Sequence, residues 1–132
     1  MNAVSFRMLW GIAIGGAAGS VTRYIISMWV ARGHGEFPLA TFGINVGGSF
    51  LIGLLARVFS TPDSNPVLRA ALTIGFCGGF TTFSTFSAEL ITLVQEGRTA
   101  RAVLYVLASV LAGALAVVAG LAVGNRLVTA RG

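Results

Sequence analysis

Three stretches of this sequence contain no charged residue, and each is long enough to cross a lipid bilayer: residues 37–56, 70–88 and 102–125. A spanning helix needs roughly 20 mostly apolar residues at about 1.5 Å of rise per residue. These stretches must form helices, because an isolated strand would leave backbone hydrogen-bonding groups unpaired in lipid. The sequence therefore predicts three membrane-spanning helices.

A fourth span is predicted at the N-terminal end, over residues 8–31, although Arg23 interrupts it. The alternative interpretation is a cleaved signal peptide, with Arg7 as its basic end and residues 11–21 as its apolar centre. Three further spans follow, and apolar residues resume at Tyr24. A first spanning helix that carries an arginine near one end is therefore preferred.

The composition favours a membrane protein and argues against several other classes. Charged residues make up only 10% of the 132 residues, whereas soluble domains average about 25%. The nine basic residues, all arginines, are scattered singly at the edges of apolar runs, and nucleic-acid binding requires clustered basic faces. One histidine, His34, and one cysteine, Cys77, cannot build a Cys/His metal site or a base beside a nucleophile. We expect neither a nucleic-acid partner nor an enzyme.

The loops between the predicted spans are short. Approximate helices over residues 8–31, 37–59, 67–94 and 99–128 predict a single all-α membrane domain over residues 1–132. Short connections make sequential helices antiparallel neighbours, so both termini are expected on one side. The arginines divide almost evenly between the two sides. Orientation follows the arginine excess on the cytoplasmic side, so this weak bias permits insertion in both directions.

Small residues recur at every fourth position in all four predicted helices. Such stripes let helix backbones approach closely where no hydrophobic effect drives association. The stripes are Gly11, Gly15 and Gly19; Gly43 and Gly47; Gly75 and Gly79; and Ala112, Ala116, Gly120 and Gly124. They predict a dense bundle that needs a partner to form a conduit.

Polar residues inside the predicted spans require an explanation, because they are costly in a membrane and usually functional. Thr41, Asn45 and Ser49 are four residues apart and therefore share one helical face. Tyr105 and Ser109 share a face of the last helix in the same way. The alternative to a functional role is plain helix-to-helix bonding, for example an asparagine that bridges two helices.

The third predicted span holds the densest signal, Gly-Phe-Cys-Gly-Gly-Phe-Thr-Thr-Phe-Ser-Thr-Phe-Ser-Ala-Glu over residues 75–89. Glycine is unfavourable by about 1 kcal/mol in a helix interior, and serine and threonine offer the backbone competing hydrogen bonds. We therefore expect a break near residues 78–82. Irregular backbone at this depth is tolerated only where it is buried in protein or lines water, and it frees carbonyl and N–H groups that can face ions.

These polar groups are hydrogen-bond donors without formal charge. The edge of a phenyl ring carries the positive part of its quadrupole, and Phe83 and Phe86 are three residues apart on one face. Such a lining suits an anion. It lacks a central arginine that would hold the anion tightly, and conduction requires that the ion can leave its site. Glu89 is the only acid in this region and lies near the end of the span.

Three strings together resemble the CrcB family, also called Fluc, which are bacterial fluoride channels. They are the run over residues 75–89, Gly-Ala-Ala-Gly-Ser-Val-Thr-Arg-Tyr over residues 16–24, and Thr-Phe-Gly-Ile-Asn-Val-Gly-Gly over residues 41–48. The resemblance covers the whole chain. It implies an antiparallel, dual-topology homodimer in the bacterial inner membrane, with two fluoride pores and a structural sodium ion at its centre.

The resemblance also implies roles for individual residues. The fluoride pore would be lined by Asn45, Phe83, Phe86, Ser84, Thr85, Tyr105, Ser109 and Thr41. Arg23 and Glu89 would lie at opposite ends of the pore, with Arg23 in a vestibule. The backbone carbonyls of Gly78 and Thr81 would bind sodium. Gly113 departs from relatives that carry serine one turn past Ser109, so water or backbone would replace that hydroxyl.

Other functions remain as alternatives. A small multidrug exporter, also a four-helix antiparallel dimer, would need a carboxylate in its first helix, and residues 8–31 contain none. A non-conducting membrane subunit held by glycine packing would leave Asn45, Tyr105 and the Thr/Ser/Phe run without a role. The sequence therefore predicts a passive fluoride channel.

Overall fold

The computed structural model describes residues 3–30, 37–61 and 63–130 and contains, over those ranges, helices and no strand. Four helices are long and apolar enough to cross a membrane, which confirms the predicted all-helical bundle of four spans. The helices are α1 (Ala3–Val30), α2 (Leu39–Val58), a composite third span and α6 (Thr99–Thr129). The predicted end of the first helix, the first loop with His34, and Arg32 and Arg131 lie outside the described residues.

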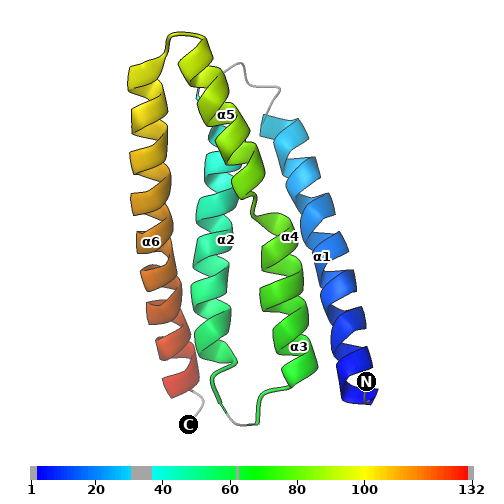
Figure 1. The fold of residues 1–132 in the computed structure, drawn as a ribbon. Coiled ribbons are helices and arrows are strands. Elements are labelled where there is room, and N and C mark those ends of the chain that lie inside the picture. The colour runs from blue at the N-terminus through cyan, green and yellow to red at the C-terminus, as the bar shows by residue number, and fades with distance from the viewer. Residues whose placement is uncertain (1–2, 31–36, 62, 131–132) are drawn as a thin grey trace.

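The third span, Pro66–Gln95, is built from four consecutive pieces. They are α3 (Pro66–Ala70), the π-helical segment η1 (Ala71–Cys77), α4 (Gly78–Phe80) and α5 (Phe83–Gln95). The predicted break is confirmed, and it lies at the C-terminal end of the expected range. Thr81 and Thr82 are extended, with φ of −77° and −149°, and Figure 1 shows the chain stepping sideways between α4 and α5. The π-helical segment was not predicted.

Local sequence explains where the third span begins and ends. The Asn65 side chain accepts hydrogen bonds from the backbone N–H groups of Val67 and Leu68, which is the usual N-cap of a helix with proline in its first turn. At the other end, Gly97 has a φ of +74°. This left-handed residue closes α5 and turns the chain into α6.

The packing of the helices differs from the sequence-based expectation. The loops do reverse the chain, but the closest pairs are not sequential: α1 packs mainly on the third span, and α2 packs mainly on α6. Both pairs run parallel, and the start of α1 and the end of α6 lie at the same end of the bundle (Figure 1). Sequential helices are antiparallel and in contact, as predicted (Figure 1), but their contacts are smaller than those of the two parallel pairs.

Glycines explain the pairing of α1 with the third span. A Cβ atom on Gly15 would overlap the Ala71 carbonyl oxygen, and one on Gly19 would overlap the Phe76 carbonyl oxygen. In return, a Cβ on Gly75 would come within 2.6 Å of the Ile12 carbonyl oxygen. The backbones of these two spans are thus in direct contact, which only glycine permits at these positions.

The contact between α2 and α6 has the same origin. A Cβ atom on Gly53 would overlap the Val117 carbonyl oxygen, and one on Gly120 would overlap the Phe50 carbonyl oxygen. By contrast, no atom lies within 4 Å of a Cβ added to Gly43 or Gly78. The predicted stripe at Gly43 is therefore not used for packing inside the protomer.

An alanine at Gly19 should destabilise the bundle by about 1–3 kcal/mol, the usual cost of forcing extra atoms into a packed contact. Its methyl group would overlap the Phe76 carbonyl oxygen and lie 2.8 Å from the Phe80 nitrogen. Chemical unfolding in detergent micelles measures the effect. Gly16→Ala is the matched control, because its methyl group would lie 3.8 Å from the nearest atom. Equal unfolding free energies for the two variants would contradict the packing explanation.

Candidate functional site

Asn45 holds the break in the third span. Its side-chain Nδ2 donates to the Thr82 carbonyl at 3.1 Å, and its Oδ1 accepts from the Thr82 N–H at 2.8 Å. Both backbone groups of the buried Thr82 are thereby satisfied, as buried polar groups must be. Asn45 thus bridges α2 and the third span, and one Nδ2 hydrogen remains for a further acceptor.

Thr82 starts α5 and joins three hydroxyl groups at the break. Its Oγ1 accepts from the Thr85 N–H at 3.2 Å and donates to the Thr85 Oγ1 at 2.9 Å. The Ser84 hydroxyl lies 3.3 Å from the same atom. Ser84 and Thr85 were predicted pore residues, whereas Thr82 was not. A threonine just before a helix start is an N-cap signal, and that signal could have identified it.

Arg23 reaches across from α1 to the end of α4. Its Nε donates to the Gly79 carbonyl at 3.1 Å, and the Ser20 hydroxyl donates to the same oxygen at 3.4 Å. The half-buried Arg23 also lines a pocket of about 180 Å³, whose other walls are Ser20, Tyr24, Ser27, Thr41, Thr82 and Thr85. A fixed positive charge therefore lies beside hydroxyl groups from three elements. Ser20 and Ser27 were not predicted.

Glu89 joins two of the predicted pore residues. The Thr41 hydroxyl donates to its Oε1 at 2.8 Å, and the Tyr105 hydroxyl donates to its Oε2 at 2.8 Å. Tyr105 is fully buried and Thr41 is 4% exposed. The three residues come from α5, α2 and α6, so this cluster ties the three helices together. Glu89 itself is half-buried.

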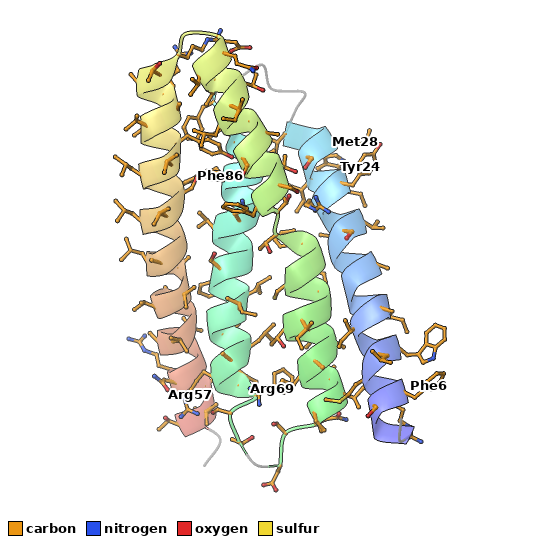
Figure 2. The ribbon with its side chains drawn as sticks, in the orientation of Figure 1. Phe6, Tyr24, Met28, Arg57, Arg69 and Phe86 are labelled. Atoms are coloured by element: carbon orange, nitrogen blue, oxygen red, sulfur yellow. The ribbon has the colours of Figure 1, made fainter. Side chains whose placement is uncertain are left out.

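The two phenylalanines at the start of α5 have different surroundings. Their ring centroids are 5.8 Å apart. Phe86 packs against Tyr105 at 4.9 Å and lies in the space between α5 and α6 (Figure 2). Phe83 is 80% exposed within the protomer and lines a groove together with Asn45 and Thr82.

That groove, of about 380 Å³, runs between α2 and the third span. Its walls are Asn45, Gly48, Ser49, Ile52, Thr73, Cys77, Gly78, Thr81, Thr82 and Phe83. A second hollow, of about 400 Å³, lies near the turn between α5 and α6 and reaches Glu89 and Thr85. An Arg98–Glu96 ion pair at 3.3 Å lies at its rim. Glu89 therefore borders a hollow that Asn45 does not line.

Carbonyl groups at the break offer a place for a cation. The Cys77 carbonyl accepts from the N–H and the hydroxyl of Thr81, and the Gly79 and Thr82 carbonyls have the partners given above. In the described part of the chain, no hydrogen bond goes to the carbonyl of Gly78 or Thr81. Gly78 is also exposed. No group of three or more His, Cys, Asp or Glu gathers among the described residues, so only backbone oxygens would serve.

Ser109 continues the polar face of α6 one turn beyond Tyr105. Its Oγ is buried and has no hydrogen-bond partner among the described residues. One turn further, a Cβ added to Gly113 would lie 3.5 Å from the Ser49 Oγ of α2. The hydroxyl of Ser49 donates to the Asn45 carbonyl at 2.7 Å.

Comparison with known proteins identifies the family. The family described as "CrcB-like protein, Camphor Resistance (CrcB)" matches residues 10–121. The chain belongs to the CrcB family. A relative from Acidobacterium capsulatum, named fluoride-specific ion channel FluC, is 45% identical over 92% of this chain and 98% of its own. A Bacillus subtilis relative, named fluoride-specific ion channel FluC 2, is 44% identical over 88% and 86%.

A third CrcB relative, from Stutzerimonas stutzeri and named fluoride-specific ion channel FluC, is 45% identical over 90% of this chain and 98% of its own. Together with the four apolar helices, these matches make the CrcB chain a multi-pass membrane protein. The predicted family resemblance is confirmed.

The structure brings most of the predicted residues of this CrcB protein into two neighbouring clusters. Around the break are Asn45, Ser84, Thr85, Phe83 and the Gly78 and Thr81 carbonyls, with Arg23 bonded to Gly79. Around Glu89 are Thr41, Tyr105 and Phe86. Ser109 alone is bonded to neither cluster.

Proposed function

We propose that this protein is a fluoride channel that lets the anion flow passively across the membrane. The observation that carries the proposal is the arrangement of uncharged donors around the break in the third span. The Asn45 amide, the hydroxyls of Thr82, Ser84 and Thr85, and the exposed Phe83 ring gather there. The names of relatives at about 45% identity support the same function.

The chemistry of this lining fits a small anion. Fluoride accepts strong hydrogen bonds, and amide, hydroxyl and ring-edge groups can replace its water without holding it as a formal positive charge would. Arg23 lies beside this lining in the pocket with Thr41, Thr82 and Thr85, and its charge would draw anions toward the entrance. No enzymatic role is proposed, because relatives are named as channels.

A homodimer with two pores and dual topology is part of the proposal. Phe83 is 80% exposed, and the surface at Gly43 and Gly78 has no packing partner within the protomer. A second copy seated there would cover these residues and close the groove beside Asn45. Mass measurement in detergent tests the dimer, and labelling of single cysteines placed in the loops from each side of the membrane tests the dual topology.

A structural sodium ion at the centre of the dimer completes the assembly that we propose. The carbonyl oxygens of Gly78 and Thr81 would hold it, since hard cations prefer oxygen ligands and neither oxygen has a hydrogen-bond partner in the described part of the chain. Bound there, sodium would supply positive charge that holds the two subunits together. Dimer stability in sodium compared with N-methylglucamine tests this assignment.

The direction of flow follows from charge. In the inner membrane of a bacterium, the negative interior drives an anion outward by about 2.3 kcal/mol per charge for each 100 mV. A channel there would lower cytoplasmic fluoride without any other energy source. Two pores per dimer would export in parallel.

Purified protein in liposomes loaded with potassium fluoride provides the test. Fluoride should leave when a potassium ionophore relieves the charge imbalance, and a fluoride electrode records the release. Liposomes loaded with potassium chloride should keep their chloride. Release must also proceed without a pH gradient, because dependence on a gradient would point to proton coupling through the half-buried Glu89. Absence of fluoride release from liposomes that contain assembled protein would sink the proposal.

A further inference from the structure

The parallel helices α2 and α6 keep a constant register along their contact. Gly53 lies against Val117, and Gly113 lies opposite Ser49 at the same sequence offset. Two more steps of this register pair Thr41 with Tyr105, and these two residues do share Glu89. Because both helices rise equally per residue, the register holds between these points.

The register sets two polar stripes against each other. At this offset, Thr41, Asn45 and Ser49 on α2 correspond in position to Tyr105, Ser109 and Gly113 on α6. At the third level the α6 stripe has no side chain, and the hydroxyl beside that gap comes from Ser49. The row of hydroxyl groups on α6 therefore ends at Gly113, and Ser49 of α2 supplies the next hydroxyl.

Ser49 has the contacts expected of a lining residue. It is one wall of the groove that also includes Asn45, Thr82 and Phe83. Its hydroxyl donates to the carbonyl of Asn45, one turn back on its own helix. Such a local bond is weak in a helix, and hydrogen bonds to an ion are roughly twice as strong as neutral ones. The hydroxyl can therefore turn from the carbonyl to a passing anion.

We propose that Ser49 lines the fluoride path and supplies, from α2, the donor that Gly113 leaves out of α6. The anion would pass from Tyr105 to the unpartnered hydroxyl of Ser109 and then to Ser49. The inference rests on the proposed fluoride function and extends it to a residue outside the predicted pore set.

The test moves one hydroxyl between two helices. In the liposome assay, Ser49→Ala should slow fluoride release about tenfold or more, the effect of removing one hydrogen bond to a charged group. The double variant Ser49→Ala/Gly113→Ser should recover to within about threefold of wild type. The new Cβ would lie 3.5 Å from the Ser49 Oγ in the native chain, which is an ordinary contact.

Controls separate a lining role from a structural one. Thr22→Val removes a hydroxyl that makes the same local bond, to Ala18 on α1, and should leave the release rate unchanged. Ser49→Cys keeps the size of the side chain with a weaker donor, and should also slow release if Ser49→Ala folds poorly. Each variant is used only as an assembled dimer.

Three results would overturn the inference. They are wild-type rates in both Ser49 variants, no recovery in the double variant when Gly113→Ser alone conducts normally, and equal slowing by Thr22→Val. In each case wild-type release still supports the fluoride channel itself. A wild-type protein that releases no fluoride overturns the proposed function, and the role of Ser49 with it.

Discussion

Replacement of Asn45 by leucine should reduce fluoride release by about 100-fold or more, because it removes two hydrogen bonds and leaves two buried backbone groups unpaired. Among the described residues, the amide is the only side chain bonded to the Thr82 N–H and carbonyl. Without it, the extended residues between α4 and α5 lose their fixed position. The hydroxyl donors of Ser84 and Thr85, which lie beside Thr82, lose their fixed positions as well.

The liposome assay measures the release rate, and unfolding in detergent measures the accompanying loss of stability. Each unpaired group should cost about 1–3 kcal/mol. Asn45→Asp keeps the acceptor for the Thr82 N–H but places a negative charge beside the path, so it should stop release with a smaller loss of stability. Asn125→Leu is the matched control, since Asn125 bonds the Arg57 side chain at the far end of α6.

Normal release by Asn45→Leu would mean that the break serves only to shape the helix. Normal release by Asn45→Asp would place the anion path elsewhere, since a fixed negative charge beside fluoride repels it at short range. Loss of release in Asn125→Leu as well would show that general destabilisation is being measured.

Phe83→Ile should reduce fluoride release by about 100-fold while the unfolding of the protomer changes little, because so exposed a side chain contributes little to packing. The ring is 80% exposed in the protomer. Isoleucine keeps an apolar side chain but has no ring edge, so it removes the positive rim that would face the anion. Function and protomer stability should therefore separate at this position.

The measurements are fluoride release and the mass of the assembly in detergent. Phe6→Ile is the matched control, because Phe6 is also exposed, at 55%, on the first turns of α1 (Figure 2). It should conduct like wild type. Dimeric Phe83→Ile protein that releases fluoride at the wild-type rate would remove the ring-edge argument. Monomeric Phe83→Ile protein would instead assign the ring to the subunit interface.

Local sequence was sufficient to predict the spans and the break. The spacing of the arginines set the lengths of the helices, and Gly78-Gly79 followed by threonines predicted irregular backbone within a few residues of Thr81. The stripes of Thr41, Asn45 and Ser49 on α2 and of Tyr105 and Ser109 on α6 followed from helical periodicity. These features depend on composition and spacing within a single helix.

Features that depend on two helices at once could not be predicted in this way. Short loops favoured sequential partners, whereas backbone contacts at Gly15 and Gly53 select α1 with the third span and α2 with α6. The bonds from Thr41 and Tyr105 to Glu89 follow from that pairing, so the pattern within one helix did not predict them. Thr82 was overlooked because its hydroxyl acts through the turn at the break rather than on a helical face.

During synthesis, α1 and α2 enter the bilayer before their main packing partners exist. The glycine face of α1 packs against η1 and α4, which are made later. The face of α2 that packs against α6 stays uncovered until α6, the last helix, is made. The first half of the chain therefore lacks both main helix pairs. A chain stopped before the third span would leave Asn45 without Thr82, its partner at the break, and the contacts at Gly53 and Gly120 form only when α6 is inserted.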